Sequence, residues 1–109
     1  MFIFGDFLTH VLAVLPSEPA VNTVTVNSTA ATVRISQSIT GTTPITYELF
    51  HRLGSTGQDM GVTVVDVEQT QIISPLFSNA QYWVYVKATN SAGSKDSAQI
   101  TVSTKQASK

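Results

Sequence analysis

The most regular pattern of apolar and polar positions lies in residues 76–93. One face of the strand predicted there holds Tyr82, Val84, Val86 and Ala88. The other face holds Trp83, Tyr85, Lys87 and Thr89. A period of two with β-branched and aromatic residues predicts a strand and not a helix. Turn-forming residues follow at 90–93, and alternation resumes in residues 97–104, which together predict a hairpin.

Similar alternation recurs through the middle of the chain. It predicts strands over residues 21–26, 31–38, 45–53, 61–68 and 70–76. About seven short strands separated by turn signals are typical of an antiparallel β-sandwich.

The facing of three of these strands can be predicted in part. Val33 and Ile35 should point inward. Residues 47, 49 and 51 share one face of the third strand. In residues 61–68 the alternation slips after Val64, which predicts a bulge or a strand buried on both faces. Pro75 predicts that its strand ends there or lies at a sheet edge.

The stretch that begins at Leu76 has a further signature, Leu-x5-Tyr-x-Val-x-Val-x-Ala-x-Asn-x-x-Gly. It resembles the sixth strand of fibronectin type III domains, and the resemblance extends less sharply over residues 19–104. It implies an all-β fold, a fibronectin type III-like antiparallel β-sandwich, over residues 19–105, followed by a tail of residues 106–109. Leu76 and Tyr82 resemble the tyrosine corner, in which a buried phenol is hydrogen-bonded to upstream backbone. Gln37 stands where the family usually has a tryptophan, so a divergent member is expected.

Residues 1–18 fall outside the resemblance and are predicted to form an apolar docking segment. Its large apolar residues follow helical spacing, at Phe4, Phe7, Leu8, Val11, Leu12 and Leu15. The pattern predicts a short helix over residues 6–15, with Asp6 as its N-cap and Pro16 ending it. A helix of about ten residues is marginal alone in water and needs a packing partner.

Three packing partners are open for this segment. It could cap an open end of its own sandwich, dock on another chain, or lie on a membrane surface. The polar face of the predicted helix carries no Lys or Arg, which disfavours the membrane. The segment is shorter than the ~20 residues that span a bilayer. It lacks a basic region and a small-residue cleavage site, so no signal peptide is expected.

Composition narrows the function classes. The 109 residues suffice for one small domain, and Thr, Val and Ser are abundant, as in β-sheet proteins. Charged residues make up 12% and the net charge is −1, so no basic nucleic-acid footprint exists and no nucleic-acid partner is expected. The chain has no cysteine, which removes disulfides and thiolate metal sites.

Catalytic patterns are missing from the sequence. His10 and His51 belong to different predicted elements and match no metal-ligand spacing. The carboxylates are scattered, no Gly-x-Ser-x-Gly motif occurs, and no Gly-rich loop opens a helix. We therefore expect no enzymatic activity, no metal and no cofactor.

The remaining candidate site consists of three aromatic residues, Phe50, Trp83 and Tyr85. The resemblance implies that the third and sixth strands are neighbours, which places these three aromatic residues on one outer sheet face. They could be cross-strand pairs, an interface anchor, or a surface covered by the N-terminal helix. A sugar platform would also need polar groups beside them.

These features favour a non-enzymatic structural protein. Small cysteine-free sandwiches rich in Thr, Val and Ser resemble accessory proteins of tailed-phage virions, such as head-decoration, tail or fibre proteins. The expected partners are capsid or tail proteins and copies of the chain itself, with a virion as the location. The alternative is a carbohydrate- or receptor-binding module on a bacterial surface or outside the cell. A spacer domain of a bacterial extracellular enzyme is a third, weaker option.

Overall fold

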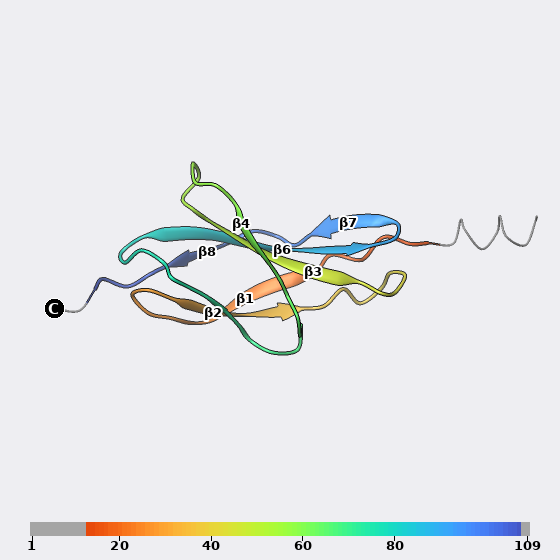
Figure 1. Cartoon of the computed structure of the whole chain (residues 1–109), viewed down its shortest axis with the longest axis horizontal. Coiled ribbons are helices and arrows are strands. Elements are labelled where there is room, and N and C mark those ends of the chain that lie inside the picture. The colour runs from red at the N-terminus through yellow and green to blue at the C-terminus, as the bar shows by residue number, and fades with distance from the viewer. Residues whose placement is uncertain (1–12, 108–109) are drawn as a thin grey trace, which may run out of the picture.

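The computed structural model of the protein describes residues 13–107, which form two antiparallel sheets packed face to face (Figure 1). The strands are β1 (Ala20–Val26), β2 (Ala31–Ser36), β3 (Thr46–Leu53), β4 (Met60–Thr63), β5 (Gln71–Ile73), β6 (Gln81–Asn90), β7 (Gly93–Asp96) and β8 (Ile100–Ser103). The smaller sheet has the order β1-β2-β5. The larger has the order β4-β3-β6-β7, and β8 also pairs with β6. The predicted all-β sandwich is confirmed, with eight strands in the described residues.

The core lies between the two sheets and contains the residues that the alternation predicted to be inward. Val33 and Ile35 of β2 are buried, as are Tyr47 and Leu49 of β3. All four predicted inward residues of β6 are buried as well: Tyr82, Val84, Val86 and Ala88. Each of these strands buries one face against the opposite sheet and exposes the other, which is why a period of two identified them.

The predicted tyrosine corner is present. The phenol oxygen of Tyr82 accepts a hydrogen bond from the backbone N–H of Phe77 at 2.7 Å. Leu76, beside it, is buried, and its own N–H donates to the carbonyl of Thr29 at 2.7 Å. The loop that enters β6 is thereby tied both to the phenol of that strand and to the turn between β1 and β2.

The last predicted strand, residues 97–104, is divided. β7 continues directly from the turn after Asn90, and β8 begins only at Ile100. Ser97 lies in the break, where its N–H donates to the carbonyl of Val86 at 2.8 Å and its Oγ accepts the N–H of Val86 at 2.9 Å. The serine side chain thus replaces a backbone acceptor, so β6 stays hydrogen-bonded although its partner strand is interrupted.

One other expectation is corrected. The strand predicted over residues 61–68 ends at Thr63, and Val65 is 96% exposed, because the chain leaves the larger sheet there and crosses to β5. Val64 and Val67 pack partly on the core from this crossing. In β1 the register with β2 shifts between Thr23 and Thr25, and Val24 between them is exposed.

Two smaller expectations concern strand ends. β5 ends before Pro75 and lies at an edge of its sheet, as predicted. β2 ends at Ser36, so Gln37 lies beyond the strand and is exposed.

Candidate docking surfaces

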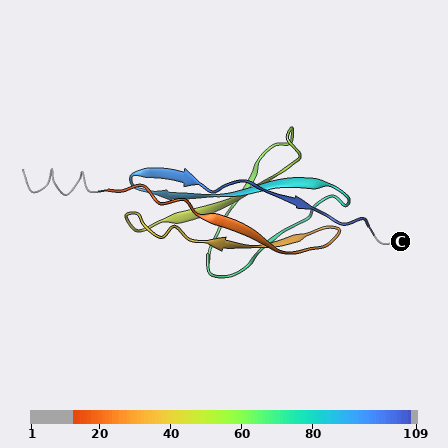
Figure 2. The same ribbon diagram turned by 180° about the vertical axis from the view of Figure 1, so that it is seen from behind.

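The first candidate surface begins where the described chain begins. Residues 13–17, here called the N-terminal anchor, run without regular secondary structure beside the loop of residues 38–42 at one end of the sandwich (Figures 1 and 2). The N–H of Val14 donates to the Thr42 hydroxyl at 2.8 Å, and the N–H of Thr42 donates to the Val14 carbonyl at 3.1 Å.

Ser17 provides the second point of attachment. Its N–H donates to the carbonyl of Thr40 at 3.0 Å, and its hydroxyl oxygen accepts the N–H groups of Ile39 at 2.8 Å and Thr40 at 3.1 Å. The hydroxyl of Ser38 in turn donates to the Ser17 carbonyl at 2.6 Å. One serine therefore fixes three successive residues of the loop.

Asn90, at the end of β6, joins the anchor to the larger sheet. Its Nδ2 donates to the carbonyls of Val14 at 2.7 Å and Thr42 at 2.9 Å, and its Oδ1 accepts the N–H of Ala92 at 2.8 Å. The sequence motif identified this asparagine, but no local signal indicated that it reaches a residue 76 positions earlier. The anchor is thus a fixed point on the sandwich.

The helix predicted over residues 6–15 is not present in the part of it that the structure describes. Residues 13–15 are not helical, because the peptide groups of Val14 bond to the 38–42 loop and to Asn90. Leu15 is 49% exposed, with its side chain near Gly93. The other predicted docking residues lie outside the described residues: Phe4, Phe7, Leu8, Val11 and Leu12.

The second candidate surface is the outer face of the larger sheet, here called the aromatic face, which comprises Phe50, Arg52, Trp83, Tyr85 and Lys87. β3 and β6 are neighbours, as predicted, with Phe50 opposite Tyr85 and Arg52 opposite Trp83. The rings of Phe50 and Tyr85 are stacked, with centroids 5.0 Å apart and planes 14° from parallel. Lys87 lies over the Phe50 ring at 5.6 Å, and Arg52 lies over the Trp83 ring at 4.8 Å. The three aromatic residues share one face and are engaged in cross-strand pairs.

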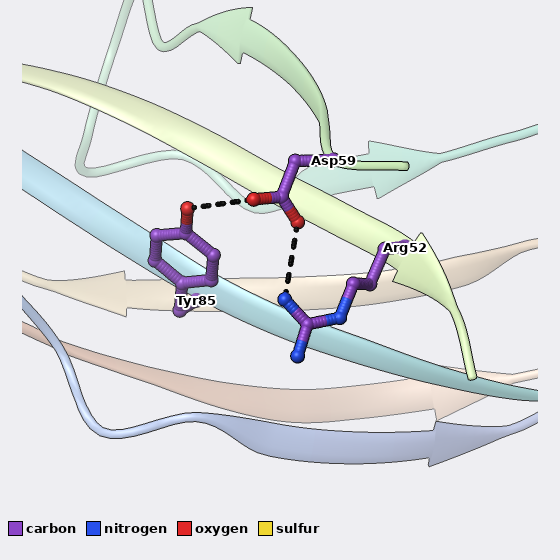
Figure 3. A network of polar contacts seen from close by, with 3 residues as sticks. All are labelled: Arg52, Asp59 and Tyr85. Atoms are coloured by element: carbon purple, nitrogen blue, oxygen red, sulfur yellow. Dashed lines mark hydrogen bonds and ion pairs between the residues drawn. The ribbon is translucent and has the colours of Figure 1, made fainter. Parts of the chain in front are cut away.

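Asp59 connects this face to the loop before β4 (Figure 3). One carboxylate oxygen accepts the phenol O–H of Tyr85 at 3.2 Å, and the other lies 3.5 Å from Nη1 of Arg52. Burial raises the pKa of the Tyr85 phenol, and the charge of Asp59 raises it further. No pattern in the sequence indicated this pairing, because Asp59 lies in a loop and 26 residues from Tyr85.

A polar hollow of about 240 Å³ lies beside Tyr85. It is bordered by Arg52, Asp96, Ser97 and Gln99 and coincides with the break between β7 and β8. The interrupted strand therefore places polar groups next to the aromatic face.

The third candidate surface, here called the edge cleft, has a volume of about 330 Å³ and lies between β4 of the larger sheet and β5 of the smaller one. Leu49 and Ile73 are buried and form part of its floor. Met60, Val62 and Ile72 line it and are 57%, 49% and 70% exposed. No sequence pattern predicted this cleft, because it arises from the alignment of two strand edges.

Residues 13–107 contain no group of three or more His, Asp or Glu side chains placed to hold a metal ion. No helix long and apolar enough to cross a membrane occurs among them.

The strand order, the tyrosine corner and the divided last strand can be compared with solved structures. The FN5 domain of Drosophila Lar is 23% identical and superposes with a TM-score of 0.67, over 84% of this chain and 99% of that domain. The fold is fibronectin type III-like. The fibronectin type-III domain of human fibronectin type III domain containing protein 3 is 21% identical, with a TM-score of 0.66 over 86% of this chain and 90% of that one. A computationally redesigned β-sandwich protein is 15% identical, with a TM-score of 0.68 over 82% of this chain and 89% of that one.

At these identities the similarity establishes the fold and not the function. No family model matches the sequence, and no curated protein matches it significantly. The fibronectin type III-like domain of this chain therefore has to be interpreted from its own surfaces.

Proposed function

We propose that the chain is a non-enzymatic structural module that docks on a larger assembly through its N-terminal segment and projects the fibronectin type III-like domain outward. The observation that carries this proposal is the N-terminal anchor. Val14 and Ser17 are bonded to the 38–42 loop and to Asn90, so the end of the chain that joins the N-terminal segment is held at a fixed point on the domain. A partner bound by that segment would hold the whole sandwich in a defined place.

The composition of the segment supports the same role. Residues 1–12 contain three phenylalanines and four aliphatic residues besides Met1. The domain closes its own core between its two sheets. Apolar residues left over after a core has closed usually mark interaction sites.

The assembly we propose is a virion, with the chain as a head-decoration, tail or fibre component. Its partners would be capsid or tail proteins and further copies of the chain. This placement rests on the small cysteine-free sandwich, on its Thr-, Val- and Ser-rich composition and on the apolar segment.

Removal of residues 2–12 tests the docking role. We expect the full chain to associate at micromolar concentrations and the shortened chain to be a folded monomer, as measured by sedimentation velocity. Removal of residues 106–109 is the matched control and should leave association unchanged. A shortened chain that associates as strongly as the full chain would overturn the proposal.

The aromatic face favours a second candidate function, binding of a glycan or a receptor. The polar hollow beside Tyr85 supplies hydrogen-bonding groups of the kind that such a site needs. Nη1 of Arg52 is bonded to Asp59, whereas its buried Nε has no hydrogen-bond partner within the described chain. One face of the Trp83 ring is covered by Arg52, and Tyr85 is stacked on Phe50, which leaves less flat surface for a sugar ring. Trp83→Ala should abolish glycan binding if this function is correct, and no binding by the unaltered chain would exclude it.

A further inference from the structure

The edge cleft is an opening that the domain does not fill with its own described residues. β4 and β5 are the outermost strands of their sheets, and the cleft runs between them. The side chains at its rim, Met60, Val62 and Ile72, are each about half or more exposed. Three large apolar side chains around one opening indicate a surface suited to an apolar occupant.

The low charge of the cleft lining also suits an apolar occupant. His51 is the one residue in its lining that can carry a charge. Burial lowers the pKa of His51, so its imidazole is neutral near pH 7. The volume of about 330 Å³ accommodates a few large side chains, but not a folded element. The cleft is large enough for an apolar segment that inserts two or three large side chains.

The same chain supplies such a segment. Residues 1–12 carry apolar residues at helical spacing, including Phe4, Phe7 and Leu8. Side chains three and four positions apart on one side of a segment are the usual anchors of a helix in an apolar groove. The segment has one acidic residue, Asp6, and no lysine or arginine that would have to be buried with it.

The position of the N-terminal anchor favours the cleft of a second copy as the docking site of this segment. Both views show that the described chain begins beyond the tip of the β6–β7 turn, past the end of the sandwich (Figures 1 and 2). The bonds of Val14 to Thr42 and Asn90 fix it there. To enter the cleft of its own domain the chain would have to reverse at once and run back along β3, whereas a neighbouring copy can be reached without a reversal.

We propose that the edge cleft receives the apolar N-terminal segment of a second copy of this chain, with Phe4, Phe7 and Leu8 as its anchors. This inference rests on the proposed function and names one docking site for the segment. Segment and cleft are different surfaces, so the contact is heterologous and generates a ring or an open array. Each copy contributes one segment and accepts one.

Because the chain contains no cysteine, introduced cysteines can test this contact directly. A chain with Leu8→Cys and Ile72→Cys should form covalent oligomers under mild oxidation, with a disulfide that joins position 8 of an isotope-labelled copy to position 72 of an unlabelled one. The matched control carries Leu8→Cys and Val65→Cys, since Val65 is also an exposed aliphatic residue but is not part of the cleft. A disulfide between the two introduced cysteines of single chains, or equal cross-linking in the control, would overturn the proposal.

A charged substitution separates this proposal from the proposed function. Ile72→Glu should weaken association at least ~10-fold, because it places an unpaired charge in an apolar contact, whereas Val65→Glu should not. Ile72 is 70% exposed, so the substitution should leave the fold intact, as far-ultraviolet circular dichroism would show. If Ile72→Glu still associates while removal of residues 2–12 abolishes association, the segment docks elsewhere and only the cleft assignment fails. If both variants associate like the unaltered chain, the proposed function fails as well.

Discussion

At the scale of single residues, two tyrosines hold irregular backbone by accepting hydrogen bonds at their phenol oxygens. Tyr82 accepts the N–H of Phe77 at 2.7 Å, and Tyr47 accepts the N–H of Ser38 at 3.0 Å. Both rings are buried in the core, so the phenol oxygen is a fixed acceptor at the edge of the sandwich. The resemblance at Leu76 predicted the first of these bonds, but no pattern in the sequence indicated the second.

Tyr82→Phe should lower the free energy of unfolding by about 1–3 kcal/mol, because it leaves the N–H of Phe77 without its acceptor in a partly buried place. Tyr85→Phe is the matched control, since it also removes one phenol oxygen. Its bond to Asp59 is exposed, so a loss below about 1 kcal/mol is expected. Urea titration measures both values. Equal losses in the two variants would contradict the role given to the tyrosine corner.

The lowered pKa of His51 predicts how the stability of the domain depends on pH. Burial lowers its pKa below the usual 6.5, so the unfolded chain takes up a proton at a higher pH than the folded chain does. The free energy of unfolding should therefore fall as the pH drops from 6.5 toward the lowered pKa of His51. His51→Gln should flatten the profile in this window, as measured by urea titration at a series of pH values. A profile that keeps the same slope in His51→Gln would assign the effect to another group.

At the scale of elements, the sequence was most informative where a strand lies between two neighbours and buries one face. β6 is such a strand, and its alternation predicted its length, its facing and its turn. β4 is an edge strand with every residue exposed, and most valines of the predicted strand lie beyond it in the crossing to β5, so the pattern did not report a buried face and the end of the strand was predicted wrongly. Local periodicity reports burial, and edges, crossings and bulges are decided by the rest of the fold.

The N-terminal anchor is the element that the sequence predicted least well. Apolar spacing favoured a helix through Leu15, but Val14 is bonded to the 38–42 loop and to the end of β6. These partners are 28 and 76 positions away in the sequence. A helical pattern on its own cannot compete with hydrogen bonds that only the closed domain provides.

Asn90→Asp should release this anchor. The aspartate keeps the oxygen that accepts the N–H of Ala92, but it replaces the donor to Val14 and Thr42 by an acceptor. We expect the free energy of unfolding to fall by about 1–3 kcal/mol, since the Thr42 carbonyl loses its side-chain donor, the Val14 carbonyl keeps only the N–H of Thr42, and both then face a charge. Asn22→Asp on the exposed side of β1 is the control and should change it by less than about 0.5 kcal/mol. Equal effects would mean that the anchor does not depend on Asn90.

At the scale of the whole molecule, the sandwich presents three surfaces of different character. The N-terminal anchor fixes the start of an apolar segment, the aromatic face is largely paired within itself, and the edge cleft is apolar and open. The sequence predicted the segment and the aromatic residues but not the cleft, because Met60 and Ile72 come together only when the two sheets stack. Which surface becomes buried on association decides between the two proposed functions.

The most direct measurement of which surface is buried is amide hydrogen exchange. The full chain is compared between associated and diluted samples. We expect residues 1–12 to exchange more slowly when the chain is associated, while residues 81–87 of the aromatic face keep the same rates. Slower exchange at residues 48–52 and 81–87, with no change in residues 1–12, would contradict the assembly role and make the aromatic face the binding surface.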